Sequence, residues 1–173
     1  LKAMGAPNNP KVEIAWNRYY DSEQIGDICR RLAAAHPRFI KYSSIGESVQ
    51  RRPLHLLTVS DFESGDADRK PAMYVDGNIH SNEIQGAEVA LYTAWYLAES
   101  YEQNLWIAEL LKERTFYIIP TINPDARDYY IRKGNTPHSP RSGLLPRDDD
   151  GDGLVDEDPL DDLDNDGNIV MMR

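Results

Sequence analysis

Apolar and polar positions follow two distinct periods along the first 130 residues, which divide this part of the chain into helices and strands. Apolar side chains recur at helical spacing over residues 22–35, and Asp21 or Ser22 is a suitable N-cap for that helix. The same spacing predicts helices over about 83–100 and 105–112.

Short β-rich runs lie between these helices. They are residues 39–45, 53–60, 72–75 and 115–120, and the last is apolar on both faces, as buried parallel strands are. We expect 72–75 to be buried as well and the polar residues 61–71 to form a loop. Strands that alternate with helices predict an α/β domain with a mixed, largely parallel central sheet flanked by helices.

The periodicity is lost after residue 130. Residues 131–173 show neither period and contain Pro137, Pro140, Pro146 and Pro159. A stretch of this length without elements of its own is unusual inside a compact domain. We expect it to need an ion, a partner or further chain to become ordered.

The net charge of −10 comes from one short region. Residues 148–166 hold ten Asp and one Glu without any Lys or Arg, and the other 18 acidic residues nearly balance 19 basic ones. No basic stripe favours a nucleic-acid partner, and no apolar run is long enough to span a membrane. The single cysteine, Cys29, falls on the apolar side of its predicted helix and is expected to be a buried structural thiol.

His80 and Glu83 stand three residues apart, just after the strand that ends at Val75 and at the start of the next helix. Open α/β sheets bind ligands at the carboxyl ends of their strands, and zinc accepts imidazole nitrogen and carboxylate oxygen. The pair is therefore a candidate for two zinc ligands. Alternatively, Glu83 is a first-turn carboxylate favoured by the helix dipole, and His80 is a surface loop residue.

Three groups of residues occur in order: a lead-in, a His-x-x-Glu loop and an Asn-Pro-Asp element. They are Tyr19-Tyr20 with Ile45-Gly46-Glu47-Ser48 and Arg52-Pro53-Leu54, then Gly77-Asn78-Ile79-His80-Ser81-Asn82-Glu83, then Asn123-Pro124-Asp125. Together they resemble the zinc carboxypeptidases, the carboxypeptidase A-like peptidases, over about residues 16–145.

The resemblance implies a zinc-dependent hydrolase that cleaves peptide bonds near a C-terminus. His80 and Glu83 match the first two zinc ligands, and a second His would complete the site and leave a position for water. A downstream Glu would be the general base, and an Arg would stabilise the oxyanion. Arg141 is the candidate for that Arg, with Arg132 as its rival, and a solvated loop Arg is the alternative for each. A further Asn-Arg pair would bind the substrate's terminal carboxylate.

Several parts of the family's pattern are missing from the sequence. His138 comes too early to be the third ligand, no Asn-Arg pair follows residue 141, and no Glu follows Glu157. We therefore expect residues 1–145 to be the N-terminal part of a catalytic domain that is incomplete at the C-terminus. The isolated chain is expected to be inactive, and the remainder of the catalytic domain is an expected partner.

Residues 146–173 are predicted to be an acidic calcium-binding insertion or tail. Two Asp-x-Asp-x-Asp-Gly repeats begin at Asp148 and Asp162, and alternate Asp residues before a Gly turn suit Ca²⁺. They resemble the calcium repeats of thrombospondin type 3 and dockerin modules, with expected ligands Asp148, Asp150, Asp152, Asp156, Asp158, Asp162, Asp164 and Asp166. The alternative is an acidic disordered linker. Calcium of this kind favours a secreted or periplasmic protein.

Two other functions stay open. A zinc amidohydrolase of acylated amino acids, similar to aspartoacylase or desuccinylase, shares the Gly-x-x-His-x-x-Glu loop and an Asn-Pro element. A non-catalytic calcium-binding module would bind calcium without zinc.

Overall fold

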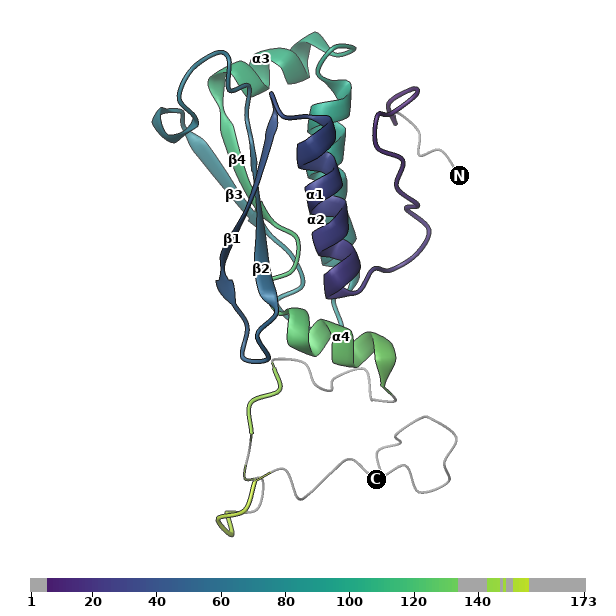
Figure 1. Ribbon diagram of the computed structural model, residues 1–173, viewed down its shortest axis with the longest axis vertical. Helices are drawn as coiled ribbons and strands as arrows, with labels where there is room; N and C mark the ends of the chain where they lie inside the picture. The colour runs from purple at the N-terminus through teal and green to yellow at the C-terminus, as the bar shows by residue number, and fades with distance from the viewer. Residues whose placement is uncertain (1–5, 134–142, 147, 149–150, 156–173) are drawn as a thin grey trace.

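The computed structural model describes residues 6–133, 143–146, 148 and 151–155. Four strands form one twisted sheet, and two long helices, α1 (Ser22–Ala35) and α2 (Gln85–Ser100), pack against one of its faces (Figure 1). Two shorter helices, α3 (Leu105–Glu113) and α4 (Pro124–Arg132), lie at opposite ends of the sheet. The predicted α/β domain with a mixed sheet flanked by helices is confirmed.

The sheet has the strand order β1-β2-β4-β3. Its strands are β1 (Ile40–Glu47), β2 (Pro53–Val59), β3 (Ala72–Asp76) and β4 (Thr115–Ile119). The pairs β1–β2 and β2–β4 are antiparallel, whereas β3–β4 is parallel. A largely parallel sheet is therefore wrong for the described part of the chain.

The expected burial of β3 is also wrong within the described residues. Met73 and Tyr74 are 58% and 56% exposed, because β3 stands at the end of the strand order and pairs only with β4 there. β4 lies between two strands, and four of its five residues are buried. An apolar run in the sequence indicates a strand but does not say which of its faces is covered.

Side chains next to the first turns of α1 and α3 cap these helices. Asp21 accepts a hydrogen bond from the backbone of Gln24, whose side chain accepts one from the backbone of Asp21. A capping box therefore begins α1, with Asp21, one of the two expected N-caps, as its first residue. Asn104 caps α3 through its side-chain oxygen, which accepts from the backbone amides of Trp106 and Ile107. A 3-10 turn, η1 (Ala67–Arg69), lies inside the expected loop. No helix among the described residues is long and apolar enough to cross a membrane.

The core lies between the two long helices and the sheet. Cys29 is fully buried there, as expected, and burial raises the pKa of its thiol to about 12. Fully buried neighbours from both layers include Ile25, Leu32, Leu57, Leu91 and Ile118.

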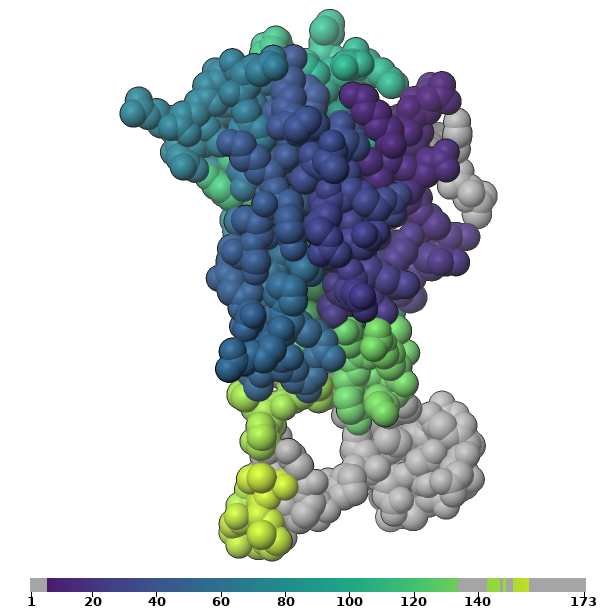
Figure 2. Space-filling view, viewed as in Figure 1, coloured from purple at the N-terminus to yellow at the C-terminus, as the bar shows by residue number. Residues whose placement is uncertain are grey.

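Residues 6–21, the segment before α1, lie along one side of the molecule (Figure 2). The carboxylate of Glu99 in α2 accepts hydrogen bonds from the backbone amides of Lys11 and Val12, at 2.8 and 2.9 Å. It also lies 2.9 Å from Nε2 of buried His36. These contacts fix the segment that leads to α1 against the end of α2.

Candidate metal centre

The candidate ligands lie in the loop between β3 and α2, which we call the ligand loop (residues 77–84). Nδ1 of His80 lies 3.1 Å from Oε1 of Glu83, and both side chains are partly exposed. A turn brings them together, because the amide of Glu83 donates to the carbonyl of His80 at 3.1 Å. The two side chains therefore point at one place beyond the carboxyl end of a strand.

The spacing of these two atoms suits two ligands of one zinc ion. Zinc–ligand bonds of about 2.0–2.2 Å at tetrahedral angles separate neighbouring ligand atoms by about 3.3–3.5 Å. The observed 3.1 Å is slightly shorter, as in a direct hydrogen bond between the two groups. In the part of the chain that is described, no group of three or more His, Cys, Asp or Glu could hold a metal.

Two glycines let the ligand loop pass close to the start of α2. A Cβ atom added to Gly77 would lie 2.5 Å from the carbonyl oxygen of Gly86 and 2.8 Å from that of Pro120. A Cβ on Gly86 would lie 2.9 Å from the amide nitrogen of Asn78. No side chain fits at either position without moving the backbone.

The backbone of the ligand loop is held by buried side chains. Asn78 is 3% exposed, has a φ of 56° and donates from Nδ2 to the carbonyls of His80 at 2.7 Å and Ser81 at 3.4 Å. Its Oδ1 accepts from Nη1 of Arg127 at 2.9 Å. Arg127 is fully buried and pairs with Glu88 of α2. Burial lowers the pKa of the Arg127 guanidinium, and Glu88 opposes that shift.

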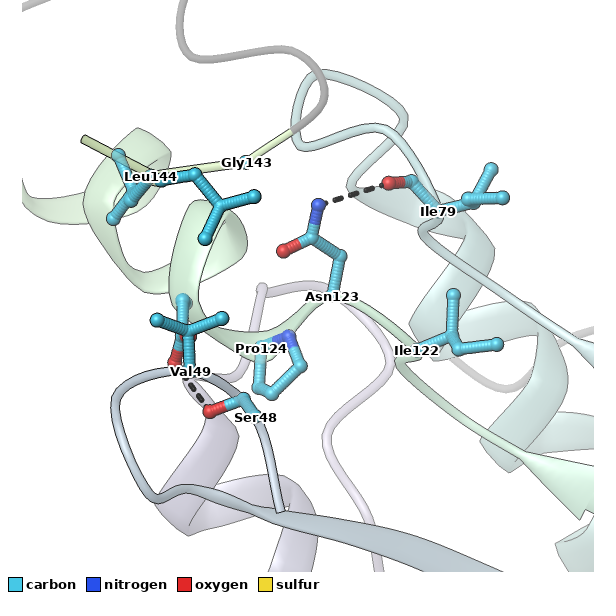
Figure 3. Close-up of a pocket in the computed structure, with 10 residues that line it drawn as sticks. Ser48, Val49, Ile79, Ile122, Asn123, Pro124, Gly143 and Leu144 are labelled. Carbon is cyan, nitrogen blue, oxygen red and sulfur yellow. Dashed lines mark hydrogen bonds between the residues drawn. The ribbon is translucent and has the colours of Figure 1, made fainter. Parts of the chain in front are cut away.

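A pocket of about 540 Å³ adjoins the ligand loop (Figure 3). Ile79 forms one side of it, and Asn123 reaches across to donate from Nδ2 to the carbonyl of Ile79 at 3.1 Å. Val49 from the β1–β2 turn and Leu144 from the segment after α4 contribute apolar side chains. The pocket thus joins the three groups of residues that carry the family resemblance.

The Asn-Pro-Asp element begins helix α4. Oδ1 of Asn123 accepts from the amide of Ala126, and Pro124 occupies the first turn. Burial alone would raise the pKa of the Asp125 carboxyl. Hydrogen bonds from Ser48 and Gln50 and the contact with Arg52 outweigh burial, so the pKa of Asp125 lies below its usual value.

The other predicted site residues lie apart from this loop or outside the described residues. Arg132 pairs with Asp21 at 2.6 Å and lines a different hollow, together with Ser22 and His55. Arg141 is outside the described residues, so its predicted role is untested.

Two of the predicted calcium ligands are described. Asp148 accepts from the amides of Gly151 at 2.6 Å and Gly153 at 2.9 Å, and Asp152 accepts from the amide of Leu154. Calcium binding stays a prediction, because the remaining ligands lie outside the described residues, namely Asp150, Asp156, Asp158, Asp162, Asp164 and Asp166.

Comparison with known proteins identifies the family of this fold and loop. Residues 25–143 match the zinc carboxypeptidases. The chain belongs to the zinc carboxypeptidase family. It is 31% identical over 125 residues to "Inactive metallocarboxypeptidase ECM14" of Ajellomyces capsulatus (strain H143), a match that covers 72% of this chain and 21% of that protein. It is also 26% identical over 140 residues to carboxypeptidase D of Rattus norvegicus, covering 81% of this chain and 10% of that protein.

Solved structures agree with this family. Bovine thrombin-activatable fibrinolysis inhibitor, in complex with tick carboxypeptidase inhibitor, matches with a TM-score of 0.63 and 25% identity. That match covers 79% of this chain and 40% of the other. Carboxypeptidase A from Helicoverpa armigera has the same fold, with a TM-score of 0.57, 19% identity and coverage of 72% and 30%. The chain thus spans between 10% and 40% of the length of these four proteins.

Sequence reasoning missed the buried residues behind the ligand loop. Asn78 carried a detectable signal, because Gly-Asn after a strand indicates a turn and Asn tolerates a positive φ. Glu88 and Arg127 lie on separate helices and are 39 positions apart. No local pattern indicates that such a pair is buried and in contact.

Proposed function

We propose that this chain is the N-terminal part of the catalytic domain of a zinc-dependent metallocarboxypeptidase. One observation carries the proposal: Nδ1 of His80 and an oxygen of Glu83 meet at 3.1 Å beyond the end of β3, in a member of the zinc carboxypeptidase family. His80 would bind zinc through Nδ1 and Glu83 through its carboxylate. The substrate would be a peptide or protein, cleaved near its C-terminus.

Each part of the described site has a role in this proposal. Bound zinc would polarise the scissile carbonyl and lower the pKa of a bound water. The pocket beside Ile79 would hold part of the peptide against Val49 and Leu144, with Asn123 at its edge. The third ligand and the general base would come from chain beyond these 173 residues. Arg141 remains our candidate for the oxyanion Arg.

A second candidate is a family member without peptidase activity. A relative 31% identical over 125 residues carries the name "Inactive metallocarboxypeptidase ECM14". That resemblance favours a protein that keeps the fold and lacks catalysis. Both candidates retain the ligand loop, so activity of the whole protein must distinguish them.

The proposal is tested on the intact protein that carries this chain. Metal content and hydrolysis of C-terminally blocked and unblocked peptides are measured for the wild type, His80→Gln and Glu83→Gln. We expect chelator-sensitive release of C-terminal residues, lost in both variants, with Arg69→Gln, an exposed residue, as an unchanged control. Zinc binding without hydrolysis would favour the second candidate. Zinc content that neither variant lowers would refute the ligand assignment.

Calcium binding by residues 146–173 and a secreted or periplasmic location are further proposals. Their support is the repeated Asp-x-Asp-x-Asp-Gly pattern. Calorimetric titration should show heat of Ca²⁺ binding that is lost in Asp162→Asn/Asp164→Asn. No heat at millimolar calcium would exclude the site.

A further inference from the structure

We infer that Asn78 and Arg127 are positioning residues that fix the ligand loop so that His80 and Glu83 meet at one point. This inference rests on the proposed zinc site for its functional meaning. Its structural content, that two buried side chains hold the loop, can be measured without metal.

Asn78 holds the loop from inside the turn. Its amide group donates to the carbonyls of His80 and Ser81, so one side chain fixes two consecutive peptide units. The backbone of Asn78 has a φ of 56°, a conformation that Asn and Gly adopt more readily than other residues. One of these carbonyls belongs to His80 itself. Movement of that peptide unit would therefore move the imidazole of His80.

Arg127 spans the loop from one end to the other. Its Nη1 donates to Oδ1 of Asn78 at 2.9 Å, before the two candidate ligands, and to the carbonyl of Ile84 at 2.7 Å, after them. One rigid guanidinium therefore sets the separation of the two positions that flank His80 and Glu83. The planar group can do this because its donors have a fixed geometry.

The other donors of Arg127 connect the ligand loop to the rest of the fold. Nε donates to the carbonyl of Tyr20 at 2.8 Å, and Nη2 donates to Glu88 of α2. Glu88 also accepts from the amide of Tyr20 at 3.0 Å. The loop is thus tied to α2, to α4 and to the residue before the α1 cap.

The charge of Arg127 is costly to bury, which argues for a geometric role. Arg127 has no exposed surface, and a buried ion pair contributes little net stability compared with apolar side chains of similar volume. What the pair provides is a unique arrangement of hydrogen bonds. Residues that orient metal ligands in this way change metal affinity by about 10- to 100-fold when they are replaced.

Two variants at Asn78 separate its contacts. Asn78→Gly permits the positive φ and removes all side-chain hydrogen bonds. Asn78→Asp keeps an acceptor for Arg127 but loses both donations to the loop and sets a carboxylate against the carbonyl of His80. Arg52→Gln is the matched control, because Arg52 also joins α4 to a loop yet contacts the β1–β2 turn and not the ligand loop.

The experiment uses the intact protein and two readouts. Amide hydrogen exchange of residues 79–84 is followed in the metal-free protein, and affinity for cobalt(II) is measured by chelator competition together with its visible spectrum. We expect Asn78→Gly and Asn78→Asp to speed exchange in the loop and to weaken cobalt binding by about 10- to 100-fold, with an altered spectrum. Arg52→Gln should leave both readouts within about twofold of the wild type.

The possible failures are distinct. The inference is overturned when both Asn78 variants keep wild-type amide exchange in the loop and wild-type cobalt affinity. This holds even where His80→Gln abolishes metal binding. Metal affinity that His80→Gln leaves unchanged would refute the proposed function, and the exchange data would still decide whether Asn78 fixes the loop. Arg127→Met should resemble Asn78→Gly in the loop, and where it does not fold, the Asn78 variants decide the outcome.

Discussion

Nη1 of Arg52 lies 2.7 Å from Oδ1 of Asp125 and joins the start of β2 to the first turn of α4. The Asp125 carboxylate also accepts from the hydroxyl of Ser48 at 2.7 Å and the amide of Gln50 at 3.0 Å. Ser48 and Asp125 also line the pocket beside the ligand loop. The lead-in and the Asn-Pro-Asp element, far apart in the sequence, therefore meet through a single carboxylate.

Replacement of Asp125 by Ala should destabilise the protein by about 2–4 kcal/mol. The substitution leaves the Ser48 hydroxyl, the Gln50 amide and part of the Arg52 guanidinium without their acceptor in a largely buried setting. Urea unfolding measures the change. Glu109→Ala, which breaks an exposed pair with Lys112, should cost no more than about 0.5 kcal/mol. Equal effects of the two substitutions would contradict this account.

Gly77→Ala should destabilise the fold and distort the ligand loop. The added methyl group would meet the backbone oxygens of Gly86 and Pro120 at 2.5 and 2.8 Å, and backbone atoms cannot rotate away as a side chain can. We expect a loss of about 2 kcal/mol or more in thermal or urea unfolding. Gly46→Ala is the comparison, since Gly46 has a positive φ but open space around it. That variant should lose only about 1 kcal/mol from backbone strain, and a larger loss there than at Gly77 would argue against the close approach.

The free energy of unfolding should fall between about pH 4 and pH 2, partly because Asp61 becomes protonated. The hydrogen bond from Arg38 is the main cause that lowers the pKa of Asp61 to about 2, and it prevails over burial. Because that pKa is lower than the unfolded value of about 3.9, the unfolded chain binds the proton first as the pH falls. The stabilisation is complete above about pH 4 and disappears as the pH approaches 2.

The acid effect is checked by comparing urea unfolding of the wild type and Asp61→Asn from pH 6 to pH 2. The wild type should be more stable at pH 6, and the difference should shrink as Asp61 becomes protonated. Asp27→Asn, an exposed position, should show a small difference at every pH. A difference in the free energy of unfolding between wild type and Asp61→Asn that stays constant with pH would show that Asp61 does not titrate in this range.

Cys29 should resist thiol reagents in the folded protein. Its side chain is fully buried, and a pKa of about 12 leaves almost no thiolate at neutral pH. Labelling with a chromogenic disulfide should therefore be slow in buffer and fast in denaturant. Ala33→Cys, on a half-buried position of the same helix, supplies a reactive reference. Rapid labelling of native Cys29 would contradict its placement in the core.

Local sequence signals predicted much of the fold. The spacing of apolar residues predicted α1, with Asp21 or Ser22 as its N-cap, and the structure confirms the helix and selects Asp21. Helix α4 was not predicted, although Asn123 followed by Pro124 is a readable start signal. The burial of β3 was predicted wrongly, because an apolar run gives the strand and not its neighbours in the sheet.

At the candidate site, too, local features were predicted from the sequence and long-range contacts were not. The sequence located the loop that carries His80 and Glu83, since ligand spacing and strand ends are local features. It gave no indication that Arg127 would reach back to Asn78, which lies 49 positions earlier. Nothing in the residues around Arg127 distinguishes a fully buried guanidinium from a solvated one.

The sequence by itself determined the periods of most helices and strands, the cap region of α1 and the position of the ligand loop. These features depend on interactions within a few residues, where side-chain type and spacing decide the outcome. Only the tertiary structure decided that β3 stands at the edge of the described sheet and that Arg127, Glu88 and Asn78 share one buried network. Burial and hydrogen-bond pairing depend on which distant segments pack together, so their energies are set when helices and sheet meet.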